Sequence, residues 1–161
     1  MTAIFLDVDG VLNCFSTDVF VPGTGIFGVE DEKAEILKQI SDLAGGARII
    51  LTSTWKFTWE KDGPKDIDSA YLVERLAAHG LTITDKIEDN WAERGAGILK
   101  YLEGHPEIDS FLILDDQLFD FKVLKLTKHL IQTSFLEDGG LKEKHLKQAK
   151  RILKKQGAFK L

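Results

Sequence analysis

Oxygen-bearing side chains follow three apolar runs of the sequence, at the point where each run ends. IFLDVDG, residues 4–10, separates the carboxylates of Asp7 and Asp9 by a single residue and ends in a glycine. ARIILTST, residues 47–54, ends in three hydroxyls, and SFLILDD, residues 110–116, ends in two carboxylates. If the runs are neighbouring parallel strands, four carboxylates and three hydroxyls meet at one edge of a sheet.

Such a cluster predicts a bound cation. Four adjacent carboxylates repel one another unless a cation neutralises them or their pKa values rise. Mg²⁺ in particular is held in proteins by a few carboxylates together with water and substrate phosphate. An isolated Asp-x-Asp-Gly could belong to a calcium loop or a turn, but the later oxygen ligands of a calcium loop are missing here. We therefore expect Mg²⁺ near Asp7, Asp9, Asp115 and Asp116.

Strand-like and helix-like patterns alternate along the chain. Strands are predicted at residues 2–8, 47–53, 81–84, 110–116 and 129–134. Helices are predicted at residues 30–44, 69–79, 92–103 and 141–156, and loops at 14–29 and 56–68. This alternation predicts an α/β fold whose parallel sheet is covered on both faces. Ligands of such sheets bind beyond the carboxyl ends of the strands, where the polar groups lie.

Length and composition indicate one globular domain spanning residues 1–161. Apolar residues make up 43% of the chain and charged residues 29%, which is ordinary for a folded domain. No run approaches the roughly 20 apolar residues of a membrane span, and residues 1–13 do not have the pattern of a signal peptide. Cys14 is the only cysteine, so no intrachain disulfide can form. We expect a cytoplasmic protein.

The three motifs together resemble those of the haloacid dehalogenase (HAD) superfamily of phosphotransferases. DVDGV, LTST and ILDD occur in the superfamily's order and spacing between Asp7 and Asp116. FLDVDGVLN, LTSTW, the stretch Arg94–Leu102 and ILDD are similar, more narrowly, to a small capless HAD domain of RNA-repair proteins. The resemblance implies a single-domain Rossmann-like fold without a substantial cap, and hydrolysis of phosphomonoesters.

The resemblance also implies roles for the carboxylates. Asp7 would be the nucleophile that forms an aspartyl-phosphate. Asp9 would protonate the leaving oxygen and then take a proton from water, and its main-chain carbonyl would bind Mg²⁺ beside the Asp7 carboxylate. Asp115 or Asp116 would complete the metal site. Gly10 would let the chain turn sharply beside the ligand.

The phosphoryl group needs further partners. By the same resemblance, Thr52 would donate a hydrogen bond to a phosphoryl oxygen and Ser53 would assist. The family also uses a basic residue there. Arg94 is preferred because of its place in the RGxxIxxYL-like stretch, Lys56 is a rival, and Lys100 is a weaker candidate because it lies deeper in its helix.

The missing cap bears on the substrate. Residues 14–29 can form only a flap, and the resemblance associates an open site with bulky substrates such as nucleic-acid ends or phosphoproteins. Residues 142–160 carry eight Lys or Arg and one Glu, a local net charge of +7, which leaves −12 on the rest of the chain. This basic helix is either a solvated face or a surface that attracts an anion. It favours a nucleic-acid end, whereas the acidic remainder opposes nonspecific binding of a phosphate backbone.

Other interpretations remain open at this level. A HAD core can serve as a non-catalytic phosphate- or protein-binding module, although the intact Asp7 and Asp9 oppose this. A phosphorelay receiver also clusters acids, but its phosphorylated Asp lies on the third strand. Trp55, Trp59 and Trp91 are expected in the core or at its rim, and Trp55 could instead stack on a base. Asp120 is expected to cap a helix. The sequence does not indicate an oligomeric state.

Overall fold

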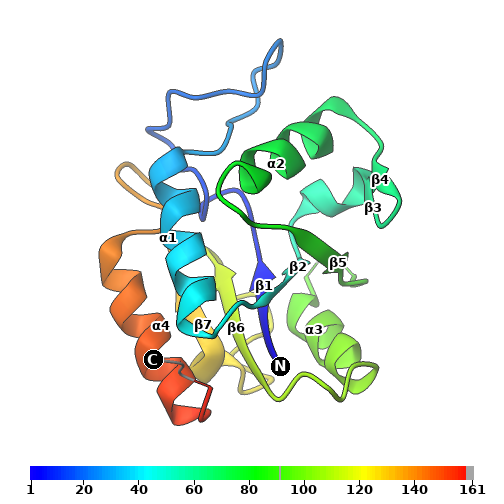
Figure 1. Cartoon of the computed structure of the whole chain (residues 1–161), viewed down its shortest axis with the longest axis vertical. Coiled ribbons are helices and arrows are strands. Elements are labelled where there is room, and N and C mark those ends of the chain that lie inside the picture. Colours follow the sequence, from blue (N-terminus) through cyan, green and yellow to red (C-terminus); the bar gives the residue numbers. More distant parts are fainter. Residues whose placement is uncertain (91, 159–161) are drawn as a thin grey trace.

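A five-stranded parallel sheet forms the centre of the protein (Figure 1). The computed structural model describes residues 1–90 and 92–158, so Trp91 lies outside the described residues. The strand order is β5-β2-β1-β6-β7. The strands are β1 (Thr2–Leu6), β2 (Arg48–Leu51), β5 (Ile83–Lys86), β6 (Ser110–Asp115) and β7 (Leu130–Gln132). Leu6, the last residue of the central strand, lies opposite Leu51 of β2 and Leu114 of β6. The residues that follow β1, β2 and β6 therefore lie side by side at one edge of the sheet.

Helices cover both faces of this sheet, as predicted. Helices α1 (Asp31–Leu43), α2 (Ile67–Ala77) and α4 (Glu143–Lys155) pack on one face. Helix α3 (Arg94–Glu103) and the segment that contains the 3₁₀ turn η2 (Thr127–His129) pack on the other.

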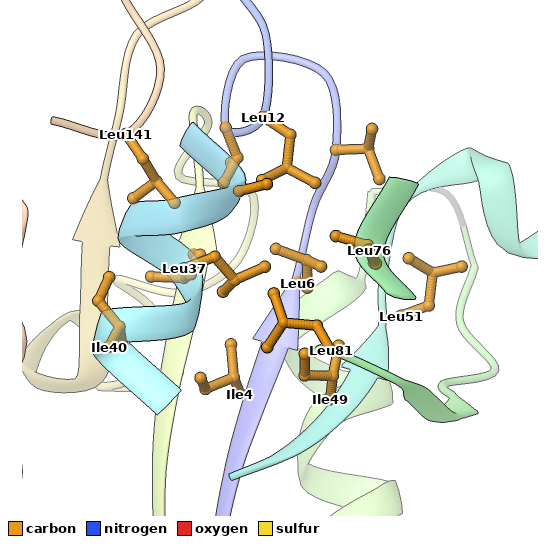
Figure 2. Close-up of a cluster of buried hydrophobic side chains, with 14 of the residues drawn as sticks. Ile4, Leu6, Leu12, Leu37, Ile40, Ile49, Leu51, Leu76, Leu81 and Leu141 are labelled. Carbon is orange, nitrogen blue, oxygen red and sulfur yellow. The ribbon is translucent and has the colours of Figure 1, made fainter. Parts of the chain in front are cut away.

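The central strand is buried on both faces. Its alternate residues serve the two cores: Ile4 and Leu6 point towards α1 and α2, and Phe5 points towards α3. Figure 2 shows Leu6 between Leu37 of α1 and Leu76 of α2. This packing fixes the end of β1, and Asp7 and Asp9 lie in the segment that follows it.

The α/β fold without a cap domain is confirmed. Residues 14–29 form a loop with a single β-bridge, between Phe20 and Phe27, and they add no second domain. Among the described residues, no helix is long and apolar enough to cross a bilayer.

The prediction of a loop at residues 56–68 is partly wrong. The chain forms the 3₁₀ helix η1 (Thr54–Thr58) and a small hairpin of β3 (Trp59–Glu60) and β4 (Gly63–Pro64). The hydroxyl of Ser53 caps η1 by accepting a hydrogen bond from the Trp55 main-chain N–H. Trp55 and Trp59 are buried in the α1–α2 core, and this burial outweighs the polar composition of the segment.

The predicted strands other than 81–84 are longer than the observed ones, because the predictions included the mostly polar residues that follow each apolar run. β1 stops at Leu6 and β2 at Leu51, which leaves Asp7 and Thr52 just beyond the sheet. The strand predicted at 81–84 forms two residues later, as β5.

Helix α4 confirms the predicted basic helix, and it runs the length of the sheet (Figure 1). Just before its start, the Leu141 N–H donates to the Val11 carbonyl, in the turn that follows Asp9. Just after its end, the side chain of Gln156 hydrogen-bonds both main-chain groups of Phe111, near the start of β6. The first lysines of the basic segment therefore lie at the carboxyl edge of the sheet, and the last ones lie at the amino edge.

Leu6→Ala tests how far the core supports the end of β1. Leu6 is fully buried, and the truncation should lower the free energy of unfolding by about 2–5 kcal/mol. Urea denaturation measures the loss. Leu136→Ala is the matched control, since Leu136 is 75% exposed and its loss should cost less than about 0.5 kcal/mol. Equal values for the two variants would contradict the packing described.

Candidate active site

A cavity of about 260 Å³ opens at the carboxyl edge of the sheet. Residues from five separate parts of the chain line it: Asp7, Asp9, Ser53, Thr54, Arg94, Asp116, Gln117, Phe119 and Phe135. The parallel register brings these parts together, as the sequence analysis expected for the motifs that follow β1, β2 and β6. The cavity is therefore the candidate active site.

Arg94 lies between two carboxylates of the cavity. Its Nη1 lies 3.2 Å from Asp7 Oδ1 and 2.7 Å from Asp115 Oδ2. The side chain is only 8% exposed, and the Phe119 ring covers the guanidinium, with Cζ 4.3 Å from the ring centroid. Buried ion pairs of this geometry hold both partners firmly, because removing one partner leaves an uncompensated charge. Of the three basic candidates, Arg94 is the one that the structure places beside Asp7.

The position of Arg94 follows from how α3 begins. Asp120 accepts hydrogen bonds from the main-chain N–H groups of Gly95 and Ala96, at 2.6 and 3.0 Å, and so caps the helix as expected. A Cβ atom on Gly95 would lie 2.7 Å from Asp120 Oδ1, so glycine allows this close approach. The cap fixes the helix start and thereby the guanidinium of its first residue.

Asp7, Asp115 and Asp116 form an acidic cluster. One carboxylate oxygen from each of the three residues lies within 4.8 Å of the other two. Burial, reinforced by the charge of Asp115, raises the pKa of Asp7 well above its ordinary value, although Arg94 opposes the shift. Burial raises the pKa of Asp115 to about 6 and also raises the pKa of Asp116. One arginine therefore does not offset the cost of holding three ionised carboxylates together.

The cluster fits a hard divalent cation. It offers carboxylate oxygens facing a cavity, and the unfavourable burial of its charge would be relieved by a cation. Both oxygens of Asp115 are already engaged, by Arg94 and by the Gln117 main-chain N–H. Asp116 lines the cavity. Asp116 is therefore better placed than Asp115 to bind a cation directly.

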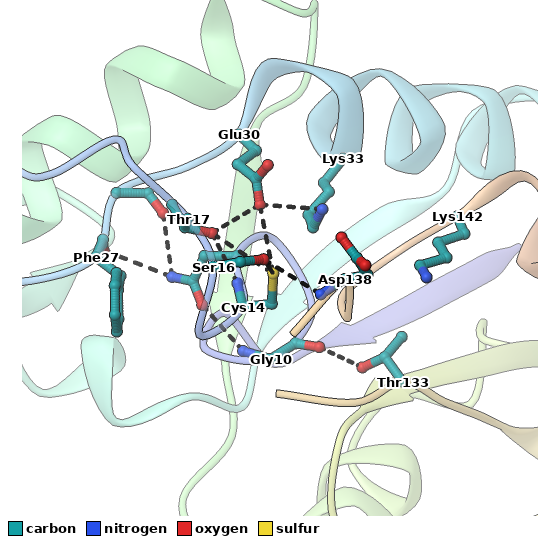
Figure 3. Close-up of polar contacts among 12 residues, drawn as sticks. Gly10, Cys14, Ser16, Thr17, Phe27, Glu30, Lys33, Thr133, Asp138 and Lys142 are labelled. Carbon is teal, nitrogen blue, oxygen red and sulfur yellow. Dashed lines mark hydrogen bonds and ion pairs between the residues drawn. The ribbon is translucent and has the colours of Figure 1, made fainter. Parts of the chain in front are cut away.

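Gly10 makes room for Asp116. Its φ of +84° is unfavourable for other residues, and an added Cβ would lie 2.5 Å from the Asp116 carboxyl carbon. Its carbonyl accepts a hydrogen bond of 2.5 Å from the Thr133 hydroxyl, as Figure 3 shows. Glycine is thus required both for the turn after Asp9 and for the close approach to Asp116, the residue that follows β6.

Asp9 has a different environment from Asp7. Its Oδ2 accepts a hydrogen bond of 3.1 Å from the indole N–H of Trp55, and its Oδ1 accepts one of 3.0 Å from the Asn13 side-chain amide. Neutral donors thus hold Asp9, whereas a charged guanidinium holds Asp7. Trp55 is buried with its N–H on this carboxylate, which supports the core position predicted for it rather than stacking on a base.

The residues after β2 divide between the cavity and its surroundings. Ser53 lines the cavity. Thr52 is fully buried outside the cavity lining, and its hydroxyl oxygen has no hydrogen-bond partner among the described residues. Lys56 is also buried, forms an ion pair with Asp89 and donates to the Thr52 carbonyl at 3.3 Å, away from the cavity. Lys100 is exposed and lines a separate groove beside Asp89.

Sequence reasoning missed several residues of the site. Asn13 carried a local signal, four residues after Asp9 in a tight turn, but Gln117, Phe119 and Phe135 carried none. They reach the site through the tertiary fold. The positive φ of Phe119, +42°, belongs to the turn after β6 that lays its ring over Arg94.

Asp116→Asn tests the repulsion within the cluster. Because burial raises the pKa of Asp116, its ionisation costs the metal-free folded protein free energy. This cost is absent below the ordinary pKa of about 4 and grows as the pH rises through the folded-state value. With chelator at pH 7 the variant should melt at a higher temperature than the wild type, and the difference should vanish towards pH 4.

Thermal denaturation across this pH range measures the effect, with Asp18→Asn as a control at an exposed acid outside the cavity. An Asp116→Asn variant that melts below the wild type at pH 7 would contradict net repulsion at this position.

Comparison with known proteins agrees with the geometry of the site. The family model described as the HAD domain in Swiss Army Knife RNA repair proteins matches residues 3–146. The matched span contains the cavity residues from Asp7 to Phe135. A search of curated proteins found no match. The chain belongs to the family of HAD domains found in Swiss Army Knife RNA repair proteins.

Proposed function

We propose that this protein is a Mg²⁺-dependent phosphomonoester hydrolase that acts through an aspartyl-phosphate on Asp7. One observation carries the proposal: Asp7 directly follows the central strand and faces a cavity that also presents Arg94, Ser53 and Asp9. Membership of a HAD family supports phosphatase-type chemistry in general. The particular reaction, metal and substrate are our inference.

The chain's own residues account for both half-reactions. In the first, an oxygen of Asp7 forms a bond to phosphorus while the bond to the leaving oxygen breaks, and Asp9 gives that oxygen its proton. In the second, water attacks the phosphorus of the aspartyl-phosphate, Asp9 takes a proton from that water, and Asp7 is released. Arg94 and Ser53 hold the equatorial oxygens, whose charge is spread throughout the transfer.

The proposed metal site uses the Asp7 and Asp116 carboxylates and the main-chain carbonyl of Asp9. Mg²⁺ bound there would offset the repulsion between the anionic nucleophile and an anionic phosphate. Asp115 has a different role in this scheme, because its two oxygens hold Arg94 and the start of the following turn.

Asp7→Asn should remove the nucleophile and lower turnover by several orders of magnitude without unfolding the protein. The measurements are hydrolysis of p-nitrophenyl phosphate and of a 3′-phosphorylated oligonucleotide, each with Mg²⁺ and with chelator. Turnover within about tenfold of the wild type would refute Asp7 as nucleophile.

The same assays distinguish the proposed enzyme from a binding module. Wild-type protein that binds the phosphorylated oligonucleotide but hydrolyses neither substrate, with Mg²⁺ present, would favour a non-catalytic module on a HAD core. Wild-type activity that survives the chelator would overturn the proposed metal dependence.

For the substrate we infer a nucleic-acid end that carries a phosphate. The family's occurrence in RNA repair proteins supports this class. Phe119 and Phe135 line the cavity, and Phe135 packs against Phe27, which stacks on the 46% exposed Phe20. Rings at the mouth of a phosphate site can stack on bases, and a flap without a cap leaves room for a polymer.

The geometry of α4 restricts which cations can contact such a substrate. Lys142 and Lys144 line a groove of about 210 Å³ with Thr133, whose hydroxyl reaches Gly10. Lys154 and Lys155 lie at the other end of a 13-residue helix, roughly 20 Å away. Since the Debye length is about 8 Å at physiological salt, charges at that end are largely screened from the cavity. We therefore propose no guiding role for Lys154 and Lys155 at the end of α4.

Lys142→Gln/Lys144→Gln should raise the KM for a phosphorylated oligonucleotide. The slope of log KM against log salt should fall by about 0.7 for each lysine that no longer neutralises a phosphate of a single strand. Lys154→Gln/Lys155→Gln is the matched control, with the same charge change at the distal end of the same helix, and should leave both quantities unchanged. A larger effect from the control pair would contradict this arrangement.

A further inference from the structure

We propose that Trp55 and Asn13 are positioning residues that hold the Asp9 carboxylate in the orientation for proton transfer. The inference rests on the proposed function, because it needs Asp9 to serve as the general acid and base. It adds two residues to that reaction, neither of which belongs to the metal site or to the phosphate-binding set.

Trp55 and Asn13 each donate one hydrogen bond to the Asp9 carboxylate, and the two bonds go to different oxygens. Trp55 Nε1 donates to Oδ2 at 3.1 Å, and Asn13 Nδ2 donates to Oδ1 at 3.0 Å. One donor on each oxygen fixes both the plane and the direction of the group. Each oxygen keeps a further lone pair, so Asp9 can carry and release a proton while both bonds persist. The bonds thus restrict orientation without blocking proton transfer.

Burial in the core and a main-chain hydrogen bond fix the position of Trp55. It is 9% exposed, its ring packs in the core with α2, and its main-chain N–H donates to the Ser53 hydroxyl at 3.3 Å. Ser53 lines the cavity and is a proposed phosphate-binding residue. The indole therefore places the general acid relative to the part of the site that receives the phosphoryl group.

Asn13 connects the general acid to the flap. Its side chain is fully buried, its Oδ1 accepts from the Gly10 N–H at 3.0 Å, and its Nδ2 also donates to the Gly28 carbonyl at 3.1 Å. The flap is further tied down by the hydrogen bond from Thr17 Oγ1 to Glu30, which Figure 3 shows beside the ion pair between Glu30 and Lys33. The Asn13 amide therefore hydrogen-bonds three parts of the protein: the main chain of Gly10, the Asp9 carboxylate and Gly28 at the end of the flap.

Orientation matters most for substrates whose leaving oxygen needs a proton. General acid catalysis contributes about 10²- to 10⁴-fold, and a misplacement of about 1 Å can forfeit about 10²-fold. p-Nitrophenolate leaves without protonation, whereas the hydroxyl oxygen of a sugar does not. A defect in positioning Asp9 must therefore be large for an oligonucleotide phosphate and small for p-nitrophenyl phosphate.

The test compares Trp55→Phe with Trp59→Phe. Both variants keep an aromatic ring in the same core and lose an indole N–H, but only Trp55 donates to Asp9. Trp55→Phe should lower kcat for the oligonucleotide phosphate by about 10-fold or more at constant KM, and for p-nitrophenyl phosphate by less than about twofold. Trp59→Phe should leave both rates near wild type.

A double-mutant cycle with Asp9→Asn separates positioning from general damage. If Trp55 acts only through Asp9, Asp9→Asn/Trp55→Phe should be no slower than Asp9→Asn. An additive loss, or equal losses on the two substrates, would overturn the inference. So would wild-type kinetics of Trp55→Phe beside an impaired Asp9→Asn, and that result would leave the proposed function intact. A fully active Asp9→Asn would instead refute the general-acid role and the inference together.

A spectroscopic readout checks the hydrogen bond without activity. In a ¹⁵N–¹H spectrum, Trp55→Phe identifies the Trp55 indole signal, and Asp9→Asn should shift that signal while leaving the Trp59 signal in place. An indole signal that does not respond to Asp9→Asn would overturn the inference even if the kinetic effects were present.

Discussion

The ion pairs of Arg94 are the interactions on which the rest of the site depends. Three carboxylates lie at the ends of β1 and β6, and burial raises the pKa of each. Arg94 is the basic side chain that reaches into this group, and it is itself almost fully buried. A buried charge is tolerated only when it is paired, so the guanidinium and the carboxylates require one another. The fold must therefore place the start of α3, where Arg94 lies, beside the ends of β1 and β6.

A capping residue and two glycines allow α3 to begin at this position. Asp120 caps the start of α3, and Gly95 and Gly97 let the helix approach its neighbours closely. An added Cβ on Gly97 would lie 2.9 Å from the Glu88 carbonyl, so a larger residue would push the helix away. The adjacent ion pair of Lys56 satisfies a second buried charge without entering the cavity. The preferred candidate Arg94 and its rival Lys56 thus have separate structural tasks.

The sequence was sufficient to predict the parts of the fold that depend on local pattern. Apolar runs buried on both faces predicted the parallel sheet, and the residues after them predicted where the acids meet. It could not predict the hairpin of β3 and β4, because the residues around the buried Trp59 are mostly polar and resemble a loop. It preferred Arg94 to Lys56 only through the family resemblance, because the ion-pair partner of Lys56, Asp89, is 33 residues away along the chain.

Asp7 and Asp9 show how one side-chain type can serve two tasks two residues apart. Both line the cavity, while Val8 between them is buried in the core and keeps the backbone in place. Asp7 faces a guanidinium and two further acids, so its environment is governed by charge. Asp9 faces an indole and an amide, so its environment is governed by the direction of neutral donors. Environment rather than residue type sets such roles, and in the proposed reaction this difference would separate the group that bonds to phosphorus from the group that moves a proton.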